Sequence, residues 1–237
     1  MDLESDIVVY HPADHRLLLC DSLQKKDRFE TFPAFSPDGR TLYFCSAEAK
    51  KIPEEYKEIR YNLCSIDFDP SAGTFGSRID TLVNAEALGK SVSFPRPSYD
   101  GKYIMFTLSD YGNFSIWHKE ANLWLLDLTS GDLRELSEVN SDDTESFHNW
   151  SSNSRWFVFS SRRGDGLYTH LYLASMDENG KISKPFLLPQ EDPETYYDRS
   201  VYSYNVPDFV NAPILLDTKV FEKRITSKER IQVQVGN

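Results

Sequence analysis

The chain has 237 residues, of which 14% are aromatic and 27% charged, and its formal net charge is −11 at neutral pH. This acidic balance disfavours binding to nucleic acid or to an anionic membrane surface, because both select clustered lysine and arginine. No apolar run reaches the roughly 18 residues that a membrane-spanning helix needs, so no membrane insertion is predicted.

Two short apolar stretches, 7–10 and 16–20, open the chain and are predicted to be the last two strands of a sheet whose first two strands are absent. The turn between them holds His11 and His15. On a turn, unlike a helix, two histidines at this spacing need not converge, so a structural turn is favoured and no metal site is predicted. The acidic residues 1–6 do not resemble the basic start of a signal peptide. Because the chain is predicted to begin in the middle of a sheet, a missing true N-terminus is favoured.

A block of thirteen residues then occurs three times without a gap. Successive blocks start 62 and 53 residues apart, close to the roughly 40 to 50 residue period of propeller blades. Each block holds a turn, of which 36–39 (SPDG) has the chemistry of a type I turn. The blocks are residues 32–44 (FPAFSPDGRTLYF), 94–106 (FPRPSYDGKYIMF) and 147–159 (FHNWSSNSRWFVF).

The strand that ends each block is apolar on both faces, so it is expected to lie between stacked sheets. This predicts that Phe44, Phe106 and Phe159 are buried between neighbouring sheets. A third strand follows each block, at 62–67, 122–127 and 170–175, and a turn then leads to a fourth strand, at 79–83, 133–136 and 185–188. Four antiparallel strands per repeat predict an all-β fold of the β-propeller type.

The pattern F-x-x-[FPW]-S-x-[DN]-[GS]-[RK], a hydrophobic strand and then N-L-x-x-x-D resembles the PD40 (WD40-like, TolB-like) β-propeller repeat. Residues 35–40 (FSPDGR) are nearly the consensus, whereas the third copy departs from it at Asn153 and Ser154. Residues 156–190 are also similar to TolB-like propellers of Bacteroidetes-type bacteria. The resemblance covers about residues 2 to 210. It implies a periplasmic or cell-envelope location and about six or more blades, but propellers host many functions.

Three complete blades with partial blades at their ends are therefore expected. Because closed propellers have typically about four to eight blades, a piece of a larger propeller is favoured, with unpaired strand edges that promote self-association. In the alternative, residues 200–206 and their successors complete the N-terminal sheet and close a four-bladed ring. The predicted divisions are a partial blade at 1–28, blades at 29–90, 91–143 and 144–195, a partial blade at 196–210 and a C-terminal strand or tail at 211–237.

The three cysteines, Cys20, Cys45 and Cys64, form no CxxC pair, and all three are expected in strands as small core residues. A disulfide between Cys45 and Cys64 stays open, because sequence alone cannot establish it. His148 is placed in an inner strand and His170 in a third strand, and structural roles are favoured for both. No catalytic motif occurs, so no catalytic residue, metal or cofactor is predicted.

Loops carry function on rigid scaffolds, and in a propeller the loops between second and third strands share a rim with the links between blades. This rim is predicted to bind a protein or peptide partner, or a glycan, through aromatic side chains set among carboxylates. A solvated acidic rim with its aromatic residues folded inward is equally open. The predicted rim residues are Tyr111, Phe114, Trp117, His118, Arg162, Arg163, Asp165, Tyr196 and Tyr197.

Two function classes follow from these patterns. The favoured one is a non-enzymatic TolB-like scaffold that binds a partner in the bacterial cell envelope. The alternative is the propeller portion of a hydrolase or of a polysaccharide lyase. A hydrolase would need a separate catalytic domain. A polysaccharide lyase would need several histidines that converge on the propeller axis.

Overall fold

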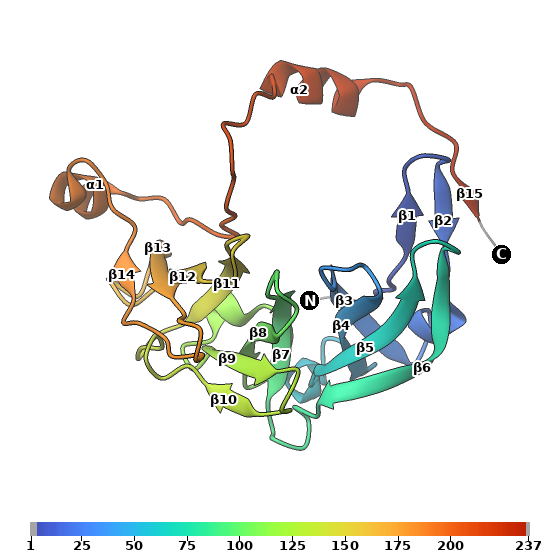
Figure 1. Cartoon of the computed structure of the whole chain (residues 1–237), viewed down its shortest axis with the longest axis horizontal. Helices are drawn as coiled ribbons and strands as arrows, with labels where there is room; N and C mark the ends of the chain where they lie inside the picture. Colours follow the sequence, from blue (N-terminus) through green and yellow to red (C-terminus); the bar gives the residue numbers. More distant parts are fainter. Residues whose placement is uncertain (1–3, 236–237) are drawn as a thin grey trace.

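The structure is a computed structural model, and it describes residues 4–235. Its sheets stand side by side in an open arc (Figure 1), and the predicted all-β, propeller-type fold is confirmed. The expectation about the start of the chain rests partly on residues 1–3, which lie outside the described residues. Neither helix of the described chain has the length and apolar character that crossing a bilayer requires.

Three four-stranded antiparallel sheets form the blades, and each follows the chain from strand to strand. The first blade consists of β3 (Arg28–Phe35), β4 (Thr41–Glu48), β5 (Asn62–Asp69) and β6 (Thr74–Val83). The second consists of β7 (Ser91–Pro97), β8 (Tyr103–Ser109), β9 (Asn122–Asp127) and β10 (Leu133–Glu135). The third consists of β11 (Glu145–Trp150), β12 (Trp156–Ser161), β13 (His170–Ser175) and β14 (Phe186–Leu187).

The remaining elements lie at the two ends of the chain and in the loops. A smaller sheet joins β1 (Val9–His11) to β2 (Arg16–Leu18) and, in parallel, β2 to β15 (Gln234–Val235). The helices are α1 (Pro193–Arg199) and α2 (Thr218–Thr226), with short 3-10 helices η1 (Asp21–Leu23), η2 (Tyr56–Glu58) and η3 (Ser115–Trp117).

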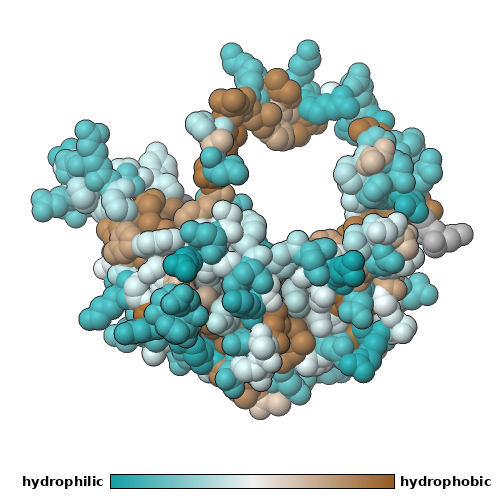
Figure 2. Space-filling model, viewed as in Figure 1, coloured by the Kyte–Doolittle hydropathy of each residue, from teal (hydrophilic) through white to brown (hydrophobic). Residues whose placement is uncertain are grey.

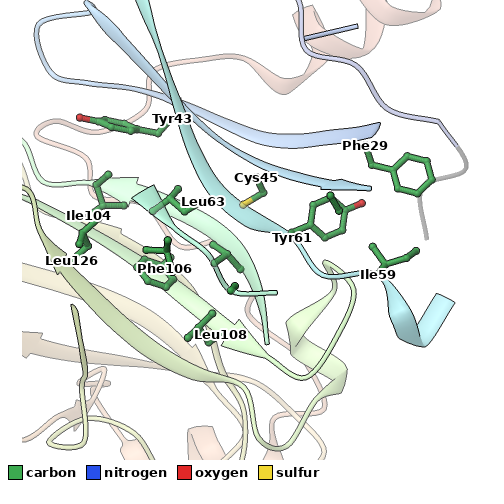
Figure 3. Packing of buried hydrophobic residues seen from close by; sticks show 14 residues of the cluster. Phe29, Tyr43, Cys45, Ile59, Tyr61, Leu63, Ile104, Phe106, Leu108 and Leu126 are labelled. Carbon is green, nitrogen blue, oxygen red and sulfur yellow. The ribbon is translucent and has the colours of Figure 1, made fainter. Parts of the chain in front are cut away.

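Apolar clusters fill the spaces between neighbouring sheets, as the strand pattern predicts. Phe44 packs between the N-terminal segment and the first blade. Phe106 packs between the first and second blades (Figure 3), and Phe159 between the second and third. All three rings are fully buried, which confirms the prediction made from the repeated block.

The first residue of each repeated block adopts an unusual backbone conformation. Phe32, Phe94 and Phe147 have φ angles of 53°, 54° and 49°, a region that bulky residues rarely occupy. Each lies at a bulge, where the register between the first and second strands of its blade shifts. The three rings contact one another in sequence in tilted pairs, with centroids 4.1 Å apart for Phe32 and Phe94 and 4.7 Å for Phe94 and Phe147. The bulges thereby direct one aromatic ring per blade into contact with the next.

The turn within each block is the same in all three blades, although its sequence differs in the third. Gly39 and Gly101 have φ angles of 69° and 71°, and Ser154 takes the same conformation at 57°. The hydroxyl of Ser154 accepts a hydrogen bond from the backbone nitrogen of Asp100 at 2.9 Å, in the neighbouring blade. This contact accounts for a serine at a position that otherwise favours glycine.

The segment after the third blade departs from expectation, because within the described chain residues 200–206 form no strand. The backbone nitrogen of Tyr204 donates to the Thr169 carbonyl at 3.0 Å, and the Ser160 hydroxyl donates to the Tyr204 carbonyl at 2.7 Å. In β12 the side chains of Phe157 and Phe159 pack toward the second blade, so Ser160 lies on the opposite face. The segment thus covers the outer face of the third blade and does not complete the N-terminal sheet.

Within the predicted C-terminal strand or tail, residues 218–226 form a helix, α2, which was not predicted. The side chain of Asp217 caps this helix by accepting the backbone N–H of Lys219. Val220, Phe221 and Ile225 are exposed, and Figure 2 shows hydrophobic residues of this segment on the side that faces the opening of the arc. Beyond α2, the chain reaches β15 beside β2 (Figure 1).

The cysteines are free, so the disulfide left open between Cys45 and Cys64 is not formed. Cys45 lies in β4 and Cys64 in β5, where burial raises the pKa of both thiols. Cys20 lies between β2 and η1, so its placement in a strand was wrong. β2 ends at Leu18, and the chain turns there into the short helix that buries Leu23 against the first blade.

Candidate functional site

An aromatic pocket lies between the loops that follow the second strands of the first two blades. One loop connects β4 to β5, and the other connects β8 to β9. The cavity has a volume of about 260 Å³ and is open to solvent. Its lining residues are Tyr56, Ile59, Tyr61, Tyr111, Gly112, Asn113, Phe114, Trp117 and His118.

Ring contacts organise the wall of this aromatic pocket. The ring of Tyr111 packs edge-on against Tyr56 of the first blade, with centroids 5.7 Å apart. It also packs edge-on against His118, at 4.5 Å. The Nδ1 atom of His118 lies 2.8 Å from Glu120 Oε1, so a carboxylate fixes the orientation of the imidazole ring. Rings from two blades therefore form one continuous surface.

Two aromatic side chains of this surface are exposed. Trp117 at the end of η3 has 74% of its surface accessible, and Phe114 has 47%. The guanidinium group of Arg162, from the third blade, lies 4.7 Å from the centre of a Trp117 ring. Stacking on a cation holds a large indole in place at the surface without burying it.

Hydrogen bonds below the pocket tie its loops to the blades. The Ser91 hydroxyl accepts the backbone N–H of Tyr61 at 2.9 Å and donates to the Gly112 carbonyl at 2.6 Å. The Thr144 hydroxyl donates to the Ser115 carbonyl at 3.0 Å, which fixes η3 against the link to the third blade. The exposed aromatic side chains consequently project from a rigid support.

Arg163 is half-buried and does not contribute to the aromatic pocket. Its Nη2 atom lies 2.9 Å from Oε1 of Glu145, a carboxylate with no exposed surface. Its guanidinium group also lies over the rings of Phe159 and Tyr172, at 5.4 and 4.6 Å. Burial raises the pKa of Glu145, although Ser141 and Arg163 oppose the shift. Adjacent residues in one loop thus have different partners: Arg162 lies over Trp117, whereas Arg163 pairs with Glu145.

The other predicted rim residues lie away from the aromatic pocket. The carboxylate of Asp165 accepts the backbone N–H groups of Leu167 and Tyr168 and so closes a local turn. The hydroxyl of Tyr197 donates to the Leu188 carbonyl at 2.5 Å, and that of Tyr196 contacts the hydroxyl of Tyr204. The two tyrosines of α1 therefore pack with the segment that covers the outer face of the third blade. The structure therefore brings together Tyr111, Phe114, Trp117, His118 and Arg162, and places Arg163, Asp165, Tyr196 and Tyr197 elsewhere.

The histidines examined from the sequence do not converge. His148 is buried, its Nε2 atom lies 2.9 Å from the Met105 carbonyl, and burial lowers its pKa to about 3. His170 packs against Tyr197, 4.9 Å away. His11 bonds to Asp14, and His15 bonds to the hydroxyl of Tyr10. Among residues 4–235, no group of three or more His, Cys, Asp or Glu side chains could hold a metal ion.

Tyr56, Ile59 and Tyr61 of the pocket were not predicted. Their loop follows β4 just as the predicted loop follows β8, so the equivalence of the two loops was the signal that could have identified them. Their contact with Tyr111 depends on how neighbouring blades pack, and this packing has no local sequence pattern.

Comparison with known proteins gives likeness of fold only. No family model and no curated protein matches the chain. TolB from Acinetobacter baumannii is 20% identical, covering 65% of this chain and 31% of that chain, with a TM-score of 0.38. A TolB structure from Agrobacterium tumefaciens is 19% identical, covering 69% and 50%, with a TM-score of 0.45. An oligogalacturonate lyase in complex with manganese is 12% identical, covering 71% and 44%, with a TM-score of 0.49.

Peptidases are among the other similar structures. The chain spans half or less of the length of the TolB structures that it resembles. The propeller-type fold itself follows from the strand order and the packing between blades.

Proposed function

We propose that this chain is a non-enzymatic, propeller-type scaffold that binds a protein or peptide partner through the aromatic pocket between the first two blades. The observation that carries the proposal is the exposed Trp117, stacked on Arg162 at the edge of a cavity of about 260 Å³. The proposed location is the bacterial cell envelope, as the sequence resemblance implies.

The chemistry of the pocket supports a peptide or protein ligand. Tryptophan, tyrosine and arginine are the residues that most often dominate protein interfaces, and here all three types meet at one place. The cavity is smaller than the roughly 300 to 1,000 Å³ of typical small-molecule sites, which suits one or two side chains of a larger ligand. The net charge of −11 favours a basic partner, because long-range attraction accelerates encounter.

The described residues offer no specific observation that favours the hydrolase or lyase alternative. His148, the histidine of an inner strand, is buried against the Met105 carbonyl. A glycan is the other ligand class proposed for an aromatic surface. Soluble oligosaccharides therefore belong in the binding assay beside peptides.

The test is to select peptides from a random phage-displayed library against the whole chain and to measure their affinity for variants. Trp117→Ala is expected to weaken binding by about 30-fold or more, which is the loss of a hot-spot residue of about 2 kcal/mol. Its thermal midpoint should change little, because the side chain is mostly exposed. Trp156→Ala is the matched control. Trp156 is also a partly exposed tryptophan, with 41% of its surface accessible. It is the first residue of β12 in the third blade and does not line the aromatic pocket.

Equal affinity of the Trp117→Ala variant and the parent for the selected peptides would contradict the proposal. So would a loss of affinity in the Trp156→Ala variant alone. A fall of several degrees in the thermal midpoint of Trp117→Ala would show instead that the indole supports the fold.

A further inference from the structure

A second cavity, of about 440 Å³, lies at the opposite end of the first blade from the aromatic pocket. Two turns of the first blade form one side, the turn before β4 and the turn after β5, and the β1–β2 hairpin forms the other. The aromatic pocket, by contrast, lies beyond the far end of β4. The hairpin cavity is lined by Val9, His11, Arg16, Leu18, Phe35, Ser36, Pro37, Gly39, Phe68, Pro70, Ser71 and Gly73.

The body of the hairpin cavity is apolar. Val9 and Leu18 contribute aliphatic groups from the hairpin. Phe35 and Phe68 contribute two aromatic rings from the first blade, with centroids 5.3 Å apart. A cavity of this volume falls within the range of small-molecule sites, which are mostly apolar and have a few polar groups that orient the ligand.

The polar groups of the hairpin cavity come from the turn motif that holds His11 and His15. Asp14 stands between two basic side chains: its Oδ1 lies 2.6 Å from His11 Nδ1 and its Oδ2 lies 3.4 Å from Arg16 Nε. Both His11 and Arg16 line the cavity. His15 turns away and bonds to the hydroxyl of Tyr10 at 2.5 Å. The motif therefore presents a guanidinium group and an imidazole, both in contact with Asp14, to a space whose other lining side chains are mostly apolar.

The guanidinium group of Arg16 already has one carboxylate neighbour, on the side of its Nε atom. Its Nε atom is buried and lies 3.4 Å from Asp14 Oδ2, and within the described residues it makes no hydrogen bond. Its Nη2 atom lies beside Gly73, 3.7 Å from where a Cβ would stand, and a side chain at this position would also crowd Leu18. The absence of a side chain at residue 73 keeps the space in front of the arginine open.

We propose that the hairpin cavity binds a small organic carboxylate. Its apolar or aromatic body would pack against Phe35, Phe68 and Leu18, and its carboxylate would pair with the planar fork of Arg16. The fork of arginine matches the two oxygens of a carboxylate, and a charged hydrogen bond is stronger in an apolar surrounding than in water. This site is independent of the aromatic pocket, so either can fail without the other.

The test uses three probes of similar shape with the isotope-labelled full chain: phenylbutyrate, the neutral phenylbutyramide and phenyl phosphate. Amide chemical shifts recorded by NMR report the location and the affinity. Phenylbutyrate is expected to shift the amides of the non-proline residues within 9–18, 36–39 and 70–73. It should bind about tenfold or more tightly than phenylbutyramide, as expected for a hydrogen bond to a charged group. Phenyl phosphate distinguishes a general anion site, if it binds equally, from a carboxylate site.

Arg16→Met is expected to reduce phenylbutyrate affinity about tenfold and to leave that of phenylbutyramide unchanged. The matched control is Arg78→Met, because Arg78 on β6 is 81% exposed, pairs with Asp80 and lies outside the cavity. If Arg16→Met does not fold, Arg16→Lys keeps the charge and removes the fork, and a loss of affinity is again expected.

Four results would overturn the proposal. They are equal binding of phenylbutyrate and phenylbutyramide, binding of phenyl phosphate as tight as that of phenylbutyrate or tighter, shifts confined to residues outside the cavity, and absence of any binding at millimolar concentration.

Discussion

The stability of the protein should depend on pH because the carboxyl group of Glu30 is buried. Glu30 lies in β3, where the first blade meets the N-terminal segment. Its side chain is 1% exposed. The Ser46 hydroxyl donates to Oε1 at 3.3 Å, whereas Oε2 has no hydrogen-bond partner within residues 4–235. Burial raises the pKa of Glu30 to about 7; the Ser46 hydrogen bond and Arg28, 4.0 Å away, oppose the shift, while Asp6 and Asp27 add to it.

The direction of the effect follows from proton binding. Because the pKa of Glu30 is higher in the folded state than its usual value of 4.5, the folded protein binds the proton more tightly than the unfolded chain does. The resulting stabilisation is complete below about pH 4.5 and is lost as the pH rises to about 7. One pKa unit corresponds to about 1.4 kcal/mol, so the whole shift gives about 3 kcal/mol at most. Solvent screening reduces this, and we expect about 1 to 3 kcal/mol.

The assay is urea denaturation of the parent and of Glu30→Gln from about pH 4.5 to 8. Glutamine keeps the shape and does not ionise, so the variant should gain stability relative to the parent as the pH rises. Glu138→Gln is the control, because Glu138 is 40% exposed and pairs with Arg134 on the surface. The quantity to follow is the free energy of unfolding of Glu30→Gln minus that of the parent. If this quantity stays constant or falls as the pH rises, the reasoning is refuted.

Further predictions concern the core, the buried ion pair and the buried histidine. Phe106→Ala should lower the free energy of unfolding by about 3 to 5 kcal/mol, and Phe114→Ala, at an exposed position, by less than about 1 kcal/mol; equal losses in urea denaturation would contradict the blade packing. Arg163→Met should cost about 3 to 5 kcal/mol because Glu145 is left buried and unpaired, and adding Glu145→Gln should recover part of the loss. The imidazole of His148 should stay neutral in an NMR titration down to about pH 4.5, and a midpoint above about pH 6 would show that it is solvated.

The blades could be predicted because their signals are local and repeated. A turn with serine and aspartate or asparagine, followed by a doubly apolar strand, identifies the first two strands wherever it occurs, and Phe106 marks a buried position by sequence alone. The bulges could not be predicted, since nothing in the residues around Phe32 specifies a positive φ at an aromatic residue. Yet the same phenylalanine opens all three blocks, and this regularity was the available clue.

The C-terminal helix was missed although its signals are present. Asp217 is a favoured N-cap, and the apolar residues Val220, Phe221 and Ile225 are spaced as on one face of a helix. The segment was predicted only as a strand or tail, and these helix signals were not used.

The aromatic pocket could be predicted only in part. The loop with Tyr111 and Trp117 stood out by composition, but its partners Tyr56 and Tyr61 come from a different blade, 50 or more residues away in the chain. Arg162 and Arg163 are the same residue type, and only the structure shows that the first contacts Trp117 and the second pairs with the buried Glu145.

The most direct test of the proposed function is to locate a selected peptide on the protein by NMR. Titration of the labelled chain with the peptide that binds most tightly is expected to give the largest shifts at the amides of Ile59, Gly112 and Phe114, around the aromatic pocket. These shifts should be lost in Trp117→Ala and kept in Trp156→Ala. The account would be contradicted if the shifts were concentrated on the third blade or around the hairpin cavity while the amides of the aromatic pocket did not change.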